Sequence, residues 1–416
     1  MTGSHSPRCR GCGEDLAATF VDLGMSPLCQ KHVRAEELNC MEPFYPLKAW
    51  VCTSCWLVQL EEYVSPLQLF EDYEYLSSFS TSWIEHARRY VGMIIDRLDL
   101  TSESLAIEIA SNDGYLLQHF LDRNIPCLGI DPAKNVADVA ARKGIRCLNR
   151  FFNRQTASDV LQQYGLADLL IGNNVLAHVP DIHEFIAGMT IVLDEDGVIT
   201  MEFPHLMQLV KQCQFDTIYH EHYSYFLLLV VQNLFAQHEL RIFDVEELSS
   251  HGGSLRIYAC HSRCVRHADS RSAYNLVQRE IADGFTSIGP YEGFEARVKE
   301  TKRRLLTFLI EAKRAGKSIA GFGAPGKGNT LLNYCGIRTD FIDFIVDGSP
   351  VKQGTFTPGT RIPILHPDAI REFRPDYVLI LPWNLRREIA NSAQYIRDWN
   401  GQFVVPIPEL DVFPAP

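Results

Sequence analysis

The chain has 416 residues, of which 46% are hydrophobic and 22% are charged, a composition typical of a soluble globular protein with two or three domains. Its net charge of -12 argues against a nucleic-acid-binding protein, which normally carries a basic domain or patch. The N-terminus, Met1 to Pro7, lacks the apolar core of a signal peptide and no run reaches the roughly 18 apolar residues of a transmembrane helix, so we expect a cytoplasmic protein.

Two C-x2-C pairs near the N-terminus predict a metal site. The four residues are Cys9, Cys12, Cys52 and Cys55. Each pair turns both thiolates toward one ion, and two pairs complete the tetrahedral sulfur site that suits Zn²⁺. Four protein ligands leave no position for a substrate, so we expect a structural zinc ion that stabilises a segment with a marginal core. The alternative is a set of unrelated reduced cysteines, as we expect Cys29 and Cys40 to be.

From about Ser82, helices alternate with short apolar strands, which predicts a doubly wound α/β domain. The predicted strands are residues 105–109, 127–130, 168–172 and 197–201. Ligands of such folds bind beyond the carboxyl ends of the strands. The residues at these ends are therefore our candidates for binding a cofactor: Glu108, Ser111, Asn112, Asp113, Gly114, Asp131, Asn173 and Asn174.

The turn after the first strand, residues 110–114, contains one glycine and lacks G-x-G-x-x-G, which argues against the pyrophosphate of a dinucleotide. An acidic turn with one glycine favours a cofactor that carries a sulfonium and an amino acid, as in S-adenosylmethionine-dependent methyltransferases. Asp131 ends the next strand, where a carboxylate can accept both hydroxyls of a ribose. The alternative is a cofactor-free domain in which Glu108 and Asp131 are capping or turn carboxylates.

A second glycine-rich turn follows a helical stretch in the C-terminal third. Residues 321–326 match G-x-G-x-x-G, and glycines in such a turn let backbone amides approach phosphate at the start of a helix. We predict strands at residues 344–347 and 376–381, and recognition of a nucleotide diphosphate on the substrate rather than a nicotinamide. A tight turn that binds nothing is the alternative. The substrate-binding candidates, which include two residues near a glycine-rich turn at 251–254, are Gly323, Lys327, Asp347, Lys352, His251 and Arg256.

Between these regions, residues 219–223 place two imidazoles, a carboxylate and two phenols in one window, Tyr-His-Glu-His-Tyr. Histidine titrates near neutral pH and accepts a proton without being permanently charged. We therefore predict a site for proton abstraction here. The alternative is a chance cluster on a hydrogen-bonded loop. The residues alone leave open whether His220 or His222 faces the substrate.

The chain resembles one family over nearly its whole length. The resemblance is carried, in this order, by the cysteine pairs and by residues 108–117, 219–225, 251–256 and 321–333. It is the sugar C-methyltransferases that act on nucleotide-linked 4-keto deoxyhexoses. The resemblance implies an α/β protein with a small zinc-binding domain at 1–80, a central Rossmann-like S-adenosylmethionine methyltransferase domain at 81–300 and a Rossmann-like nucleotide-sugar-binding domain at 301–416. Ala110 stands where we expect glycine in many relatives, a swap that widens the turn slightly.

The resemblance also implies roles for individual residues. His222 is the expected general base, with Tyr219 and Glu221 beside it, and His178 is expected near the sugar. Removal of a proton beside the ketone gives an enolate whose ring carbon, C3 in the nearest relatives, takes the methyl group. Tyr219 or Tyr223 is expected to donate a hydrogen bond to the enolate oxygen, and Glu221 to orient an imidazole.

The expected cofactors are S-adenosylmethionine and a structural zinc ion. The expected partner is a 4-keto deoxy sugar linked to dTDP or another nucleoside diphosphate, with no nucleic acid or membrane partner, and we expect a monomer or homodimer. One rival function is an O- or N-methyltransferase on a similar sugar nucleotide. The other is a non-catalytic zinc-ribbon interaction protein.

Overall fold

The computed structural model describes residues 7–70, 73 and 76–415. They form two compact units, each made of three segments of the chain. Unit 1 comprises the described residues of Met1–Ala17, Cys52–Leu206 and Tyr223–Ser287, and unit 2 those of Ala18–Val51, Met207–His222 and Ile288–Pro416. These units are defined by contacts and combine distant segments, whereas the predicted domains at 1–80, 81–300 and 301–416 are continuous. The predicted division stays a prediction.

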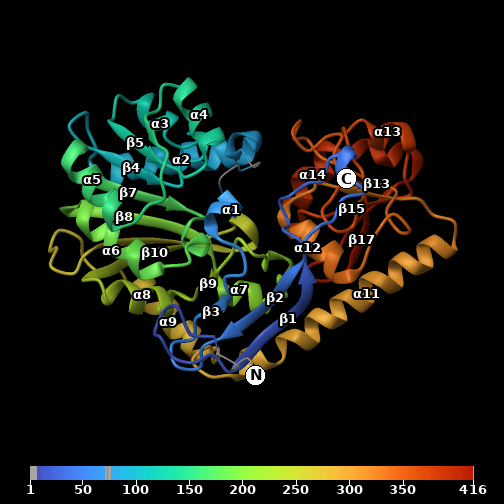
Figure 1. Ribbon diagram of the computed structural model, residues 1–416, viewed down its shortest axis with the longest axis horizontal. Helices are drawn as coiled ribbons and strands as arrows, with labels where there is room; N and C mark the ends of the chain where they lie inside the picture. The colour runs from blue at the N-terminus through green and yellow to red at the C-terminus, as the bar shows by residue number, and fades with distance from the viewer. Residues whose placement is uncertain (1–6, 71–72, 74–75, 416) are drawn as a thin grey trace. The chain divides into compact units, whose positions relative to one another are not determined.

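Within the described residues, unit 1 contains a seven-stranded sheet in the order β10-β11-β8-β7-β4-β5-β6 (Figure 1). The strands are β4 (Ala106–Ile109), β5 (Cys127–Ile130), β6 (Cys147–Leu148), β7 (Ala167–Asn173), β8 (Leu193–Pro204), β10 (Leu240–Leu248) and β11 (Ser254–His261). Five neighbouring strands, from β6 to β8, are parallel, whereas β11 runs antiparallel to both β8 and β10. The central strand β4 is buried along its whole length, as expected for a parallel strand covered on both faces.

Helices and short turns connect these strands. They are α1 (Pro66–Phe70), η2 (Ser77–Phe79), α2 (Thr81–Leu98), α3 (Gln118–Leu121), α4 (Lys134–Arg142), α5 (Arg154–Tyr164), η3 (Leu176–His178), α6 (Ile182–Val192), α8 (Leu228–Ala236), η5 (Ser250–Gly252) and α9 (Arg271–Ala282). The short strands β3 (Val58–Leu60) and β9 (Ser224–Tyr225) pair antiparallel. Ser80 caps α2 by accepting from the Trp83 N–H at 3.2 Å, and the apolar stripe from Ala87 to Ile94 faces the core.

Unit 2 contains a six-stranded sheet among the residues that the structure describes, in the order β14-β13-β12-β15-β16-β17. Its strands are β12 (Ile319–Phe322), β13 (Phe344–Val346), β14 (Ile364–Leu365), β15 (Tyr377–Ile380), β16 (Gln402–Val405) and β17 (Asp411–Pro414). All pairs are parallel except β16 with β17. A separate antiparallel pair, β1 (Ala18–Ser26) and β2 (Tyr45–Val51), belongs to the same unit.

The longest helix of unit 2 is α11 (Phe294–Arg314), drawn in orange in Figure 1. It packs on β1 through Phe20 and Phe294, whose rings stack at 4.3 Å. The other helical elements are η1 (Ala35–Glu37), α7 (Leu206–Lys211), η4 (Phe215–Thr217), α10 (Gly289–Glu292), α12 (Gly326–Cys335), α13 (Ala369–Phe373), η6 (Trp383–Leu385), α14 (Arg386–Ser392) and η7 (Gln394–Trp399). None of the described helices is both long and apolar enough to span a membrane.

The observed elements confirm the predicted α/β class. Each predicted strand of the central and C-terminal regions lies within or overlaps one of the strands β4, β5, β7, β8, β13 and β15. The antiparallel pairs β1–β2 and β10–β11 were not predicted. Both sheets therefore present the carboxyl ends of parallel strands, where the predicted binding residues lie.

Candidate functional site

Cys9, Cys12, Cys52 and Cys55 come together in unit 1 as the sequence predicted. Their sulfur atoms all lie within 4.8 Å of one another, with two Sγ pairs at 3.5 Å. Thiolates about 2.3 Å from a tetrahedral zinc ion stand roughly 3.8 Å apart. The Gln59 side-chain N–H donates to the Cys9 sulfur at 3.1 Å, an interaction typical of a metal-bound thiolate. The cluster thus fits a structural zinc ion.

The first cysteine turn also reaches a predicted catalytic residue. The Arg10 guanidinium donates to the Leu60 carbonyl and to the Pro180 carbonyl, the latter at 3.2 Å, and lies over the Tyr223 ring at 5.3 Å. Tyr223 is buried, and its hydroxyl donates to the Val64 carbonyl at 3.2 Å. This hydroxyl is engaged within unit 1, and the catalytic roles of Tyr219 and Tyr223 stay predictions.

His178 lies close to Tyr223 in unit 1. The Tyr223 N–H donates to the Ala177 carbonyl at 2.7 Å, which joins the start of β9 to the η3 turn that ends at His178. The His178 ring meets the Phe70 ring edge to face at 5.6 Å. The segment that follows the cysteine pairs therefore helps to place His178.

The predicted cofactor turn after β4 has an unusual backbone. Ala110, Asn112 and Gly114 have φ angles of 58°, 47° and 74°, in the left-handed region that favours glycine. This explains why glycine is expected at position 110, while the expectation that alanine widens the turn slightly and leaves the cofactor assignment intact stays a prediction. Alanine at such an angle costs about 1 kcal/mol or more.

Two carboxylates border this turn. Asp131 accepts the backbone N–H groups of Asn112 and Ala133, both at 2.9 Å, and burial raises the pKa of Asp131 to about 6. A carboxylate has roughly four acceptor positions, so the two bonds leave room for the predicted contact to a ribose. Asp131 directly follows β5, whose last residue, Ile130, pairs with Ile109 at the end of β4.

Glu108, inside β4, is fully buried, and neither carboxylate oxygen has a hydrogen bond of good geometry among the described residues, although the Tyr115 side chain favours its charged form. Burial, followed by the charge of Asp131, raises the pKa of Glu108 well above its ordinary value. An unsatisfied buried carboxylate is costly. A ligand that donates hydrogen bonds or carries a positive charge relieves this cost, and the amino-acid end of S-adenosylmethionine fits that requirement.

The other cofactor candidates surround the same strand end. The Asn174 N–H donates to the Glu202 carbonyl at 2.7 Å, and the Asn173 side-chain N–H donates to the Tyr115 hydroxyl at 3.5 Å. Asp113 takes hydrogen bonds from Ser78 and pairs with Lys143 at 3.4 Å. The Ser111 hydroxyl lies 3.5 Å from the Cys147 sulfur. The predicted set thus lies at the carboxyl ends of β4 and of its two neighbours in the sheet, β5 and β7.

Sequence reasoning missed the aromatic residues beside this turn. The Trp83 ring stacks with the His86 ring at 4.8 Å and with the Tyr115 ring at 6.0 Å. The ring of His251 meets Trp83 edge to face at 5.2 Å. Aromatic faces attract cations, so Trp83 and Tyr115 are suited to a sulfonium. Their sequence signal is weak, because aromatic residues on an amphipathic helix usually belong to a core.

Arg256, a predicted substrate-binding residue, is buried in an ion pair within unit 1. Its Nη2 donates to Glu202 Oε2 at 2.7 Å, and its guanidinium lies 4.5 Å from the centre of the Tyr90 ring. Glu202 also accepts from His86 at 2.8 Å and from Ser250 at 2.7 Å. This network fixes the η5 turn that carries His251. A direct role of Arg256 in substrate binding stays a prediction that the geometry does not favour.

The segment Tyr219 to His222 belongs to unit 2, and its two histidines differ. His220 is buried, its Nε2 donates to the Pro46 carbonyl at 3.1 Å, and burial lowers its pKa. His222 is half-buried, and its Nδ1 lies 2.8 Å from the Thr217 carbonyl. A carbonyl only accepts, so Nδ1 carries the proton and Nε2 of the neutral ring is basic. The geometry therefore favours His222 as the base.

Two other predicted catalytic residues, Tyr219 and Glu221, lie next to His222 in the sequence but differ in their contacts. The Tyr219 ring lies 4.0 Å from the His222 ring, which keeps the predicted enolate donor beside the predicted base. Glu221 is buried, with Oε1 at 4.0 Å from the Cys29 sulfur. The Thr217 carbonyl, which no motif indicated, orients His222, and the expected orienting role of Glu221 stays a prediction.

The glycine-rich turn in unit 2 joins β12 to α12. Gly323 has a φ of 81°, and an added Cβ would lie 2.7 Å from Pro382. The Ala324 N–H donates to Asp347 at 2.7 Å, and the Lys352 ammonium donates to the Ala324 carbonyl at 2.8 Å. Lys352 and Asp347 thus stabilise the turn itself. Their predicted contact with substrate stays a prediction.

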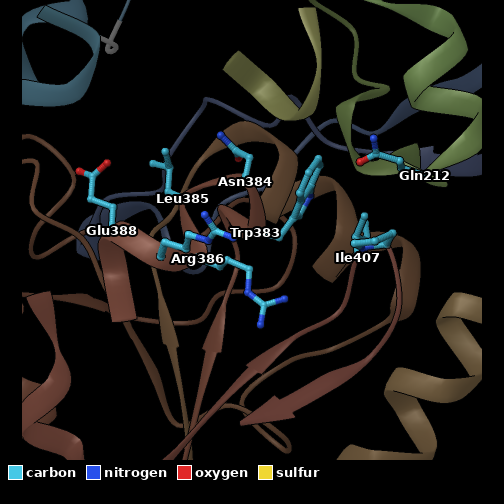
Figure 2. A pocket seen from close by; sticks show the side chains of 9 residues that line it. Gln212, Trp383, Asn384, Leu385, Arg386, Glu388 and Ile407 are labelled. Atoms are coloured by element: carbon cyan, nitrogen blue, oxygen red, sulfur yellow. The ribbon is translucent and has the colours of Figure 1, made fainter. Parts of the chain in front are cut away.

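Lys327, at the start of α12, contacts Trp383 and Asn384, two residues that line a cavity of about 420 Å³ (Figure 2). Its ammonium donates to Asn384 at 2.9 Å and lies 4.7 Å from the centre of the Trp383 ring. Burial lowers the pKa of Lys327, while the charge of Asp216 opposes this change. The cavity is lined by Gln212, Trp383, Asn384, Leu385, Arg386, Arg387, Glu388, Ile407 and Pro408.

Comparison with known proteins gives the family. A family model described as "C-methyltransferase C-terminal domain" matches residues 249–408, and one described as "Putative zinc binding domain" matches residues 9–70. C-methyltransferase NovU of Streptomyces niveus is 36% identical over 407 residues, which cover 98% of this chain and 97% of NovU. The chain belongs to this family of C-methyltransferases.

Similar solved structures include the magnesium protoporphyrin IX methyltransferase of Synechocystis PCC 6803 with bound SAM. It is 13% identical with a TM-score of 0.32, over 43% of this chain and 81% of that one. A SAM-dependent methyltransferase from Anabaena variabilis is 17% identical with a TM-score of 0.32, over 42% and 85% of the two chains. The family assignment depends on NovU and the family models, because these scores are low.

Membership confirms the predicted C-methyltransferase family. The zinc-binding prediction is confirmed by the matching family model together with the cysteine cluster. The prediction of S-adenosylmethionine agrees with the buried Glu108 and with the strand order of the unit 1 sheet, which is that of a Rossmann-like methyltransferase domain.

Proposed function

We propose that this C-methyltransferase transfers a methyl group from S-adenosylmethionine to C3 of a 4-keto deoxy sugar linked to dTDP or another nucleoside diphosphate. The relative NovU is named a C-methyltransferase, and methylation of carbon requires a carbon nucleophile. A ring carbon becomes nucleophilic when a proton beside a ketone is removed. The proposed substrate class provides that ketone.

The observation that carries the proposal is the orientation of His222. Its Nδ1–H donates to the Thr217 carbonyl, so in the neutral ring Nε2 is the nitrogen with the basic lone pair, and we assign it to accept the α-proton of the sugar. Tyr219, with its ring at 4.0 Å from that of His222, is assigned to donate to the oxygen on which enolate charge develops. One such donor contributes about 3 kcal/mol to transition-state stabilisation.

When bound, S-adenosylmethionine supplies an electrophilic methyl group on a sulfonium. The residues assigned to hold it are the candidates around the turn after β4, with Glu108 accepting its amino group and Asp131 its ribose hydroxyls. Trp83 and Tyr115 present aromatic faces at the same strand end. Lys327 and the glycine-rich turn are assigned to the diphosphate of the substrate.

The test is mass spectrometry of reactions with S-adenosylmethionine and a panel of dTDP-, UDP- and GDP-linked 4-keto deoxy sugars, with the matching 4-hydroxy sugars as controls. We expect one methyl group on a keto sugar, located by NMR on the ring carbon beside the ketone. Methylation of a hydroxyl or amine would establish the rival O- or N-methyltransferase. No saturable binding of S-adenosylmethionine would favour the non-catalytic rival.

A further inference from the structure

The short η4 turn, Phe215–Thr217, lies between α7 and the Tyr219 to His222 segment in unit 2. Its central residue, Asp216, is fully buried. The Trp383 indole N–H donates to Asp216 Oδ2 at 2.7 Å, while the buried Oδ1 has no hydrogen-bond partner among the described residues. An aspartate held in this way ties the turn to the η6 element that lines the cavity in Figure 2.

Asp216 is also electrostatically linked to Lys327. Burial raises the pKa of Asp216 to about 6, while the charge of Lys327 and the Trp383 hydrogen bond lower it. Conversely, Asp216 favours the charged form of Lys327 against burial. The Lys327 ammonium lies over the same Trp383 ring whose N–H binds Asp216. The lysine, the indole and the carboxylate therefore form one cluster at the start of α12.

The same turn holds the base. The residue after Asp216 is Thr217, whose carbonyl accepts from His222 Nδ1 at 2.8 Å. The backbone closes the intervening loop, since the Ile218 N–H donates to the Phe215 carbonyl at 3.0 Å and the His222 N–H to the Tyr219 carbonyl at 2.8 Å. Phe215 packs against Tyr334 of α12, with ring centres 5.3 Å apart. One short piece of backbone thus connects the Lys327 cluster to the imidazole of His222.

We propose that Asp216 is a positioning residue that couples a diphosphate bound at Lys327 to the orientation of His222. The proposal rests on the proposed function, which assigns the diphosphate to Lys327 and the proton to His222. Binding of an anion at Lys327 changes the charge balance around Asp216. Because Asp216 anchors η4, this change reaches the Thr217 carbonyl that fixes the His222 tautomer, and such coupling is reciprocal.

Two variants separate positioning from simple structural support. Asp216→Asn keeps the shape of the side chain but removes its charge and one acceptor oxygen, whereas Trp383→Phe removes the N–H donor and keeps a ring beside Lys327. The matched control is Asp343→Asn, because Asp343 pairs with Lys313 at 3.2 Å in the same unit and is exposed. Loss of the Asp216 charge removes the repulsion between this carboxylate and a diphosphate at Lys327, and the bound diphosphate then takes over from Asp216 in favouring the charged form of the lysine.

The experiment uses the full-length protein with dTDP as probe for binding and a dTDP-linked 4-keto deoxy sugar for proton exchange in D₂O. With Asp216→Asn we expect dTDP to bind at least as tightly as to the wild type while the exchange rate falls roughly tenfold or more. With Trp383→Phe we expect a similar loss of rate at unchanged dTDP affinity. Asp343→Asn should match the wild type in both measurements.

The NMR chemical shifts of the ¹⁵N nuclei in the His222 ring give a readout that does not depend on turnover. Their signals are assigned by their absence from the spectrum of His222→Gln. We expect dTDP to shift them in the wild type and not in Asp216→Asn. A wild-type exchange rate and ring response in Asp216→Asn would overturn the proposal, as would a joint loss of dTDP affinity, rate and melting temperature. A wild-type protein that neither binds dTDP nor exchanges the proton would instead refute the proposed function.

Discussion

His222 owes its orientation to a backbone carbonyl rather than to a carboxylate. The hydrogen bond from Nδ1 to the Thr217 carbonyl fixes the tautomer in which Nδ1 carries the proton. His220, only two residues away, uses its other ring nitrogen, Nε2, to donate to the Pro46 carbonyl. Two imidazoles close together in sequence therefore have different tasks.

The first prediction concerns this pair. His222→Gln should lower the rate of methyl transfer by about 10² to 10⁴, the usual contribution of a general base, and leave the affinity for S-adenosylmethionine unchanged. His220→Gln is the matched control, and it should lower the melting temperature more than the rate of the folded enzyme. Steady-state kinetics, calorimetry of cofactor binding and thermal melts measure these effects. Equal rates for the wild type and His222→Gln would show that another group is the base.

Glu202 illustrates how a buried charge can stabilise unit 1. Burial alone raises its pKa, but the hydrogen bond from His86 and the charge of Arg256 together lower the pKa from 4.5 to about 2. A carboxyl group of this kind contributes stability that is complete above pH 4.5 and disappears as the pH falls through about 2. Removal of one partner of a buried pair costs about 3 kcal/mol or more.

Accordingly, Glu202→Gln should be destabilised by about 3 kcal/mol at pH 7. The difference from the wild type should shrink as the pH falls from 4.5 toward 2, because the wild-type carboxyl group then becomes neutral. Urea unfolding at several pH values measures both quantities. A gap that stays constant through the acid range would mean that the charge of Glu202 is not the source of the stability.

At the scale of elements, the turn after β4 determines the shape of the predicted cofactor site. Gly114 has a φ of 74°, and an added Cβ would lie 2.2 Å from the Ile145 side chain. Gly144 has a similar φ of 82° but nothing within 4 Å of an added Cβ. The two glycines therefore differ in their surroundings and not in their backbone strain.

Gly114→Ala should lower both stability and S-adenosylmethionine affinity, whereas Gly144→Ala should lower stability alone, by about 1 kcal/mol. The reason is that the first substitution displaces the backbone of the turn and the second does not. Calorimetric titration with S-adenosylmethionine and thermal melts of both variants test this. An unchanged cofactor affinity in Gly114→Ala would place the cofactor away from this turn.

The cysteine pairs act on the elements next to them. Cys52→Ser should reduce the zinc content and the melting temperature, because three remaining ligands hold a structural ion poorly. Cys40→Ser is the control, since Cys40 is an exposed thiol outside the cluster. Inductively coupled plasma mass spectrometry gives the metal content. A full zinc content in Cys52→Ser would disprove the four-cysteine site.

Some of these elements are readable from sequence and some are not. Strands such as β4 and β5 are short apolar runs bounded by turn residues, and these runs alone located them. The pairing of β11 with β8 is antiparallel and places Arg256 against Glu202, a contact between residues distant in sequence. The sequence therefore suggested an exposed binding role for Arg256, whereas the structure shows a buried ion pair.

On the scale of the whole molecule, each compact unit is assembled from three separate segments. Local patterns predict elements and motifs but do not show which segments pack together. The Tyr219 to His222 motif was recognised in the sequence, and the choice of His222 followed from the family resemblance. The contacts that distinguish the two histidines are made by the carbonyls of Pro46, which binds His220, and Thr217, which binds His222. Thr217 is held in turn by its neighbour Asp216 and by Trp383, and none of these residues belongs to a recognisable motif.

The most direct test of the account is solvent exchange at the sugar ring. The wild type and His222→Gln are incubated in D₂O with S-adenosylhomocysteine and a dTDP-linked 4-keto deoxy sugar, and NMR follows the proton beside the ketone. We predict exchange catalysed by the wild type and its loss in His222→Gln, with unchanged cofactor binding. Exchange at equal rates in both proteins, or methyl transfer by the wild type without any exchange, would contradict the proposed enolate chemistry at His222.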